Sequence, residues 1–166
     1  MPENDTQINI EKLKDQLLRL LANYHVDPVI GQNKHSRGAT YEIKTKEAQL
    51  VVTLGDEWIG YELEINPDTT EYNKHGMRAF EDTDLYPLGG KNLEISMEIF
   101  HETLTCLRAL LDGEIFIGID EKHKTILAIP INSTDSKVRR SGRFMSTYEI
   151  LTKKEVSAMS GLRKVQ

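Results

Sequence analysis

The sequence predicts a single α+β domain, residues 1–166, built on a mostly antiparallel sheet of about five to six strands. Two to three helices are expected to pack on one face of that sheet. Two kinds of apolar periodicity predict this class, a two-residue alternation for strands and three- and four-residue steps for helices. Short polar connections between consecutive strands indicate antiparallel pairing. The expected order is helix, three strands, long loop, helix, three strands, helix.

The first helix is expected from Asn9, which can cap it, to about His25, after a loose terminus at residues 1–8. It should end before Asp27-Pro28, because the residue preceding a proline avoids the helical conformation. Its apolar stripe comprises Ile10, Leu13, Leu17, Leu20, Leu21 and Tyr24.

Three strands are expected next, at residues 41–45, 50–54 and 59–65, after a loop-like segment at residues 29–38. Each alternates apolar with other residues, so one face should be buried and the other wet. In the third strand the wet face would carry Trp58, Gly60, Glu62 and Glu64. Polar connections at 46–47 and 55–57 favour a meander.

The second half of the chain predicts another helix, from Ser96 as its cap to about Asp112, with Gly113 as its stop. A hairpin follows, with strands at residues 115–119 and 126–131 turning at 120–123. Pro130 places its second strand at a sheet edge or near its own end. A sixth strand is expected at residues 144–150, and the Thr152 to Glu155 capping-box pattern opens a short last helix.

The segment from Asn66 to Asn92 has no regular pattern over 27 residues, and connections of that length are usually functional or disordered. It carries residue types enriched at the centres of protein interfaces, together with many carboxylates. These are Tyr72, Met77, Arg78, Phe80 and Tyr86, and Asp68, Glu71, Glu81, Asp82 and Asp84. We therefore predict a long functional loop here.

Charge is distributed unevenly along the chain, whose net charge is −5. Residues 47–100 hold 12 acidic and 3 basic side chains, whereas residues 134–166 hold 8 basic and 3 acidic ones. The acidic balance argues against nucleic acid as the main partner. Two interpretations stay open: it favours a basic protein as partner, or it only keeps the protein soluble. One cysteine, no secretory pattern at the start and no long apolar run predict a cytoplasmic protein without a membrane partner.

Patterns for established chemistry are weak, so neither a cofactor nor a metal is predicted. His101-Glu102 is followed by Thr105 rather than the second histidine of a zinc-protease helix. Gly89-Gly90-Lys91 lacks the frame of a phosphate-binding loop. Cys106 is expected in the core, and the five histidines are scattered.

A basic cluster comprises Lys137, Arg139, Arg140 and Arg143. Two interpretations stay open for it: a contact for an anion or RNA, or a solvated loop that balances the acidic middle of the chain.

Asp27 and the Glu42-Ile43-Lys44 triplet allow an enzymatic alternative. An Asp and a Glu can bind a divalent metal while a nearby Lys stabilises charge, which suits phosphodiester hydrolysis. The spacing resembles the D…ExK signature of restriction-type nucleases, and the resemblance covers residues 10–65. It implies a metal-dependent nuclease in which Glu42 and Lys44 share a strand face.

The leading hypothesis is a non-enzymatic protein-binding module. A small acidic protein without a catalytic pattern is similar in profile to bacterial immunity or antitoxin proteins, which neutralise a basic toxin such as a nuclease by direct binding. A second binding hypothesis rests on the element order, which resembles that of small acidic type III secretion chaperones for effector proteins. No pattern indicates a small-molecule substrate. The expected partner-binding residues are Trp58, Glu62, Glu64, Tyr72, Arg78, Phe80, Glu81, Asp82, Asp84 and Tyr86.

Overall fold

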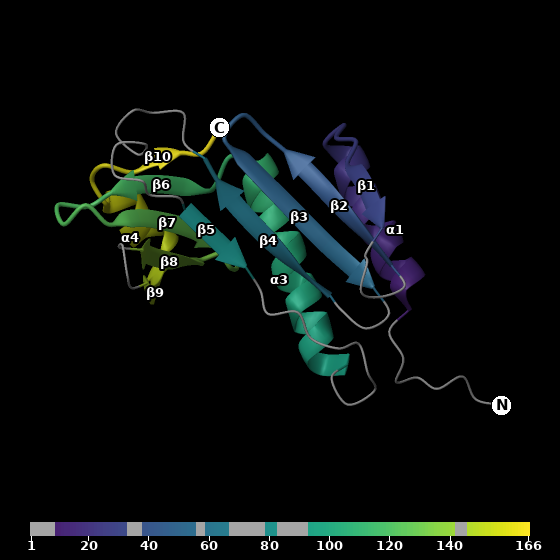
Figure 1. The fold of residues 1–166 in the computed structure, drawn as a ribbon. Coiled ribbons are helices and arrows are strands. Elements are labelled where there is room, and N and C mark those ends of the chain that lie inside the picture. Colours follow the sequence, from purple (N-terminus) through teal and green to yellow (C-terminus); the bar gives the residue numbers. More distant parts are fainter. Residues whose placement is uncertain (1–8, 33–37, 56–58, 67–78, 83–92, 142–145) are drawn as a thin grey trace. The chain divides into compact units, whose positions relative to one another are not determined.

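The computed structural model describes residues 9–32, 38–55, 59–66, 79–82, 93–141 and 146–166 (Figure 1). It confirms the α+β class. The strands form two sheets rather than one, with the orders β1-β2-β3-β4-β5 (sheet A) and β10-β6-β7-β8-β9 (sheet B). The elements are α1 (Ile10–Asn23), β1 (Val29–Gln32), β2 (Gly38–Lys44), β3 (Ala48–Gly55), β4 (Ile59–Ile65), β5 (Ala79–Asp82), α3 (Leu93–Leu111), β6 (Phe116–Ile119), β7 (Thr125–Pro130), β8 (Asp135–Ser141), β9 (Ser146–Thr152), α4 (Lys153–Ala158) and β10 (Arg163–Lys164).

The chain divides into two compact units. The first contains residues 1–44, 49–63 and 82–104, and the second contains residues 45–48, 64–81 and 105–166. Helix α3 is continuous across the change from one unit to the other, at Leu104 and Thr105.

Helix α1 forms as its sequence predicts. The Asn9 side chain accepts hydrogen bonds from the main-chain N–H groups of Glu11 and Lys12, at 3.1 and 3.4 Å. These bonds satisfy donors that have no partner inside the helix. The buried residues of α1 are Leu13, Leu17 and Leu21, which belong to the predicted stripe.

In the first unit, strands β2 and β3 pair antiparallel and bury one face. Tyr41 lies opposite Val52 and Ile43 opposite Leu50, and all four side chains are at most 2% exposed. Figure 1 shows α1 and the first part of α3 on one side of this sheet. The other side carries the alternate residues, and we call it the outer face of sheet A.

Among the described residues, β1, β5, β8 and β10 lie in segments for which no strand was predicted. Val29–Gln32, predicted as loop, forms β1 and pairs with β2. Its four residues are all exposed, so no alternation between buried and wet positions marks it in the sequence. Ala79–Asp82, inside the predicted long loop, forms β5.

The second helix begins earlier than predicted. Helix α3 begins at Leu93, so Ser96 lies inside it and is fully buried, and the prediction of Ser96 as its cap is wrong. Serine favours caps because its side chain bonds nearby backbone, but Leu93 and Glu94 are good helix formers that extend the helix upstream. The predicted stop is confirmed, because Gly113 has a φ of +69°, a conformation that favours glycine.

In the second unit, the predicted hairpin forms as β6 and β7, and β8 and β9 extend the sheet. Pro130 is the last residue of β7, where its missing N–H interrupts little pairing. The predicted capping box at Thr152 and Glu155 opens α4. One face of sheet B packs with α4 around a core cluster of Ile126, Ala128, Val138 and Val156.

Burial of Tyr41 makes the stability of the protein pH-dependent in the alkaline range. Desolvation raises the pKa of its phenol above 10.0, although Lys14 lowers it and Glu11 raises it further. The folded state therefore holds this proton more tightly than the unfolded state, and stability falls as pH rises through about 10. We expect Tyr41→Phe to reduce the loss in unfolding free energy seen by urea denaturation between about pH 9 and 11. An identical decline in both proteins would contradict this assignment.

Candidate binding surfaces

The outer face of sheet A displays carboxylates between apolar and hydroxyl side chains. In β4, Tyr61 and Leu63 are buried, whereas Glu62 is exposed and Glu64 is half-buried, as strand alternation predicts. Gly60, predicted on the wet face, is buried instead. On β2 and β3 the same face carries Glu42 opposite Val51.

The proposed nuclease residues are partly brought together. Glu42 and Lys44 share a face of β2, as predicted, and their side chains form an ion pair of 2.8 Å. Asp27 lies two residues before β1, whose Val29 is opposite Glu42. Among the residues that the structure describes, no three His, Cys, Asp or Glu side chains gather in a group that could hold a metal ion.

The structure describes only some of the remaining predicted contact residues. Phe80, Glu81 and Asp82 lie on β5. The others, Trp58, Tyr72, Arg78, Asp84 and Tyr86, lie outside the described residues.

The basic cluster is a strand rather than a loop. Lys137, Arg139 and Arg140 belong to β8, and Arg143 lies outside the described residues. The Lys-Val-Arg alternation at 137–139 is the signal for a strand, because Val138 between the two cations is fully buried.

The strand splits the charges of this cluster between two faces. The Lys137 ammonium lies 4.7 Å and the Arg139 guanidinium carbon 5.4 Å from the centroid of the Tyr148 ring, both within cation–π range. Arg140 points to the opposite face and forms an ion pair of 2.8 Å with Glu149. The cluster is therefore partly engaged within its own sheet.

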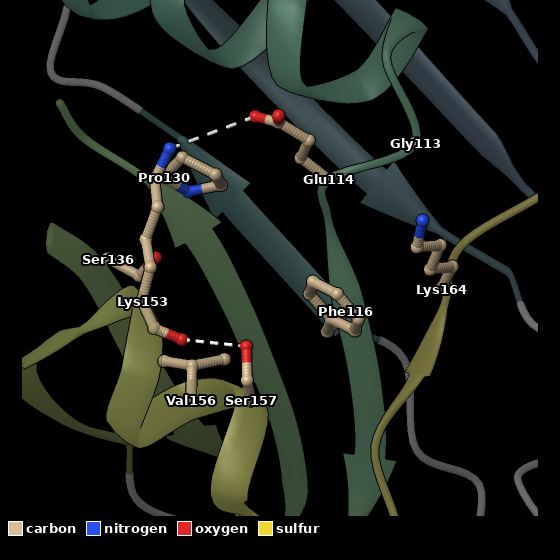
Figure 2. Close-up of a pocket in the computed structure, with 9 residues that line it drawn as sticks. All are labelled: Gly113, Glu114, Phe116, Pro130, Ser136, Lys153, Val156, Ser157 and Lys164. Atoms are coloured by element: carbon tan, nitrogen blue, oxygen red, sulfur yellow. Dashed lines mark hydrogen bonds and ion pairs between the residues drawn. The ribbon is translucent and has the colours of Figure 1, made fainter. Parts of the chain in front are cut away.

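A pocket of about 200 Å³ lies in the second unit, between α4 and sheet B (Figure 2). Phe116, Pro130 and Val156 form its apolar wall. The Lys153 ammonium lies 3.9 Å from the Glu114 carboxylate at its rim. None of these residues was predicted as a site. Because ligand pockets usually measure about 300–1,000 Å³, this volume is too small to indicate a substrate site.

Comparison with known proteins does not assign this fold to a family: no family model, no curated protein and no solved structure matches the chain. Within the described ranges, no helix is both long enough and apolar enough to span a bilayer.

Proposed function

We propose that this protein is a non-enzymatic binding module of the bacterial immunity or antitoxin type, which neutralises a basic toxin such as a nuclease in the cytoplasm. The observation that carries the proposal is the carboxylate-bearing outer face of sheet A, with Glu62 exposed on strand β4, between β3 and β5. This strand belongs to the segment 47–100, in which acidic side chains outnumber basic ones by 12 to 3.

The charge of this segment favours a particular kind of partner. A field of one sign accelerates encounter with a protein of opposite charge and disfavours partners of like charge. The basic cleft with which a nuclease binds phosphates is such a partner, because carboxylates can occupy the positions of the phosphates. Aromatic residues of the predicted contact set, such as Phe80 in β5, would supply the apolar contacts that dominate affinity.

The first experiment is affinity capture of the tagged protein from its native cytosol at low and at moderate salt, read by mass spectrometry. We expect one basic protein, present at a stoichiometric amount and retained at moderate salt, because specific interfaces do not depend on screened charges alone. Capture of no specific protein at either salt concentration would contradict the proposal.

Charge reversal at Glu62 tests which surface makes the contact. Glu62→Lys should slow association with the captured partner about three- to tenfold and weaken its dependence on salt, because surface charges act mainly on the on-rate. The matched control is Glu98→Lys, which changes the net charge equally at an exposed position of α3. Equal effects of the two variants, measured by stopped-flow or biosensor kinetics, would exclude the outer face of sheet A as the contact.

The two alternatives predict different results. A metal-dependent nuclease would cleave DNA in the presence of a divalent cation, and would lose that activity in Asp27→Ala and in Glu42→Ala. A secretion-type chaperone would bind an unfolded segment of an effector instead of a folded toxin.

A further inference from the structure

We propose that strand β9 is a self-association surface, on which two copies of the chain pair antiparallel and join their B sheets into one. This inference is independent of the proposed function. It rests on the edge position of β9, on its exposed side chains and on its self-complementary sequence.

The position of β9 leaves one of its edges open. It is the last strand of sheet B, paired on one side with β8, and no other described strand pairs with its second edge. Six of its seven residues are exposed. Natural proteins usually protect such an edge with a lysine, a proline, a bulge or a very short strand. Ser146–Thr152 contains neither lysine nor proline, so it lacks two of these protections. At its end, the Thr152 N–H donates to the Glu155 carboxylate at 2.7 Å as part of the capping box of α4.

Large apolar side chains mark the same strand. Tyr148 is 51% exposed and Ile150 58% exposed, and both lie on the face of sheet B that carries Arg139 and Lys137 opposite them. The two cations lie over the Tyr148 ring, within cation–π range. Covering these side chains with a partner strand would remove apolar area from water, which favours association.

The sequence of β9 is complementary to itself. In an antiparallel pair with its two-fold axis at Glu149, Tyr148 of each copy lies opposite Ile150 of the other. Aromatic and β-branched residues form favourable cross-strand pairs. Ser146 would lie opposite Thr152, so short polar side chains would meet at both ends. This reciprocity argues for a second copy of the chain rather than for an unrelated extended peptide.

The charge at the axis is compatible with this pairing. Two Glu149 side chains would face each other, and like charges directly opposite are destabilising. However, each Glu149 already forms a 2.8 Å ion pair with Arg140 of its own β8. The axis would therefore carry a balanced row of two cations and two anions.

We expect weak association, because one pair of edge strands buries less area than the roughly 1,200–2,000 Å² of stable interfaces. Sedimentation equilibrium of the full chain should show a monomer–dimer equilibrium with a Kd on the order of micromolar or weaker. Higher salt should strengthen it, because each copy carries a net charge of −5. Higher salt should instead weaken the binding of a basic partner. Because the two salt effects have opposite signs, failure of one proposal can be distinguished from failure of the other.

Two lysine variants test whether dimerisation depends on β9 or on exposed apolar side chains in general. Ile150→Lys should weaken dimerisation at least about tenfold, because it places a charge opposite Tyr148 and protects the edge. Val29→Lys is the matched control, since Val29 is 66% exposed on β1, the edge strand of sheet A. It should leave the dimer unchanged. A wild-type chain that stays monomeric, or a dimer insensitive to Ile150→Lys, overturns the proposal.

Cysteine cross-linking tests the register. The chain has one native cysteine, Cys106, which is buried, so new thiols report on their own positions. Glu149→Cys should form a disulfide-linked dimer under mild oxidation, because the two Cα atoms lie directly opposite each other. In the same register, the Cα atoms of the two copies of residue 147 are about four residues apart along the strands, roughly 13 Å. Thr147→Cys should therefore cross-link poorly. Equal cross-linking of both variants overturns the assigned pairing.

Discussion

Replacing Arg163 with methionine is expected to lower the free energy of unfolding by about 3 kcal/mol. Arg163 forms a two-pronged ion pair with Glu47, with Nη–Oε distances of 2.8 and 2.7 Å. The Glu47 side chain is only 3% exposed, so removing the guanidinium leaves a carboxylate that water barely reaches. The value lies near the lower end of the range for broken buried pairs, because Arg163 itself is 35% exposed.

The large effect is expected because the pair also holds two distant segments of the second unit together. The N–H of Gln166 donates to the Glu47 carboxylate at 3.1 Å. The N–H of Glu47 in turn donates to the main-chain oxygen of Gln166 at 2.7 Å. Thr45 adds a hydrogen bond from its hydroxyl to the same oxygen, at 2.8 Å. Loss of the ion pair should therefore also loosen the attachment of β10.

The matched control is Lys44→Met. The Lys44–Glu42 pair has the same closest approach, 2.8 Å, but its side chains are 66% and 27% exposed. Exposed pairs contribute about 0–1 kcal/mol, so this variant should unfold at nearly the wild-type urea concentration. A double variant, Glu47→Leu with Arg163→Met, should recover part of the loss because no charge stays buried. If Arg163→Met and Lys44→Met behave alike, burial does not determine the strength of these pairs.

The Glu47–Arg163 pair could not be predicted from the sequence. Glu47 belongs to a two-residue polar connection, and a glutamate in such a connection is normally solvated. Its partner lies 116 positions further along the chain, and no local pattern specifies a contact over that separation. The same limit applies to the division of the strands into two sheets, which depends on long-range pairing.

Local signals predicted the elements that carry them. The cap at Asn9, the stop at Gly113 and the capping box at Thr152 each bond the backbone within a few residues, so the sequence predicts them correctly. Strands β1 and β5 were missed because neither shows a two-residue alternation of apolar and polar residues, and β10 because it has two residues. Strand β8 does alternate around Val138, but its cations were interpreted as a charged cluster or a solvated loop. For the candidate site, strand periodicity placed Glu62 and Glu64 on one face of β4, whereas five of the predicted contact residues lie outside the described ranges.

Phe100→Ala is the second change with a large expected effect, and it probes the first unit. Phe100 lies on α3 and its side chain is 0% exposed. Truncating a buried phenylalanine removes its transfer free energy and leaves a cavity, so the free energy of unfolding should fall by about 3–5 kcal/mol. Alanine's higher helix propensity offsets only about 0.5 kcal/mol of this loss. Ile95→Ala, at a position of the same helix that is 41% exposed, is the control and should change stability little.

The pair of variants also tests the prediction of a single domain. Phe100 belongs to the first compact unit and Arg163 to the second. If the chain unfolds as one cooperative domain, each variant should shift one common urea transition, whether it is followed by far-UV circular dichroism or by tryptophan fluorescence. The continuity of α3 through Leu104 and Thr105 favours this result, because helix formation is cooperative. Unfolding the part of α3 that belongs to one unit should therefore destabilise the part that belongs to the other unit. Two separable transitions, one sensitive to Phe100→Ala and the other to Arg163→Met, would show two domains instead.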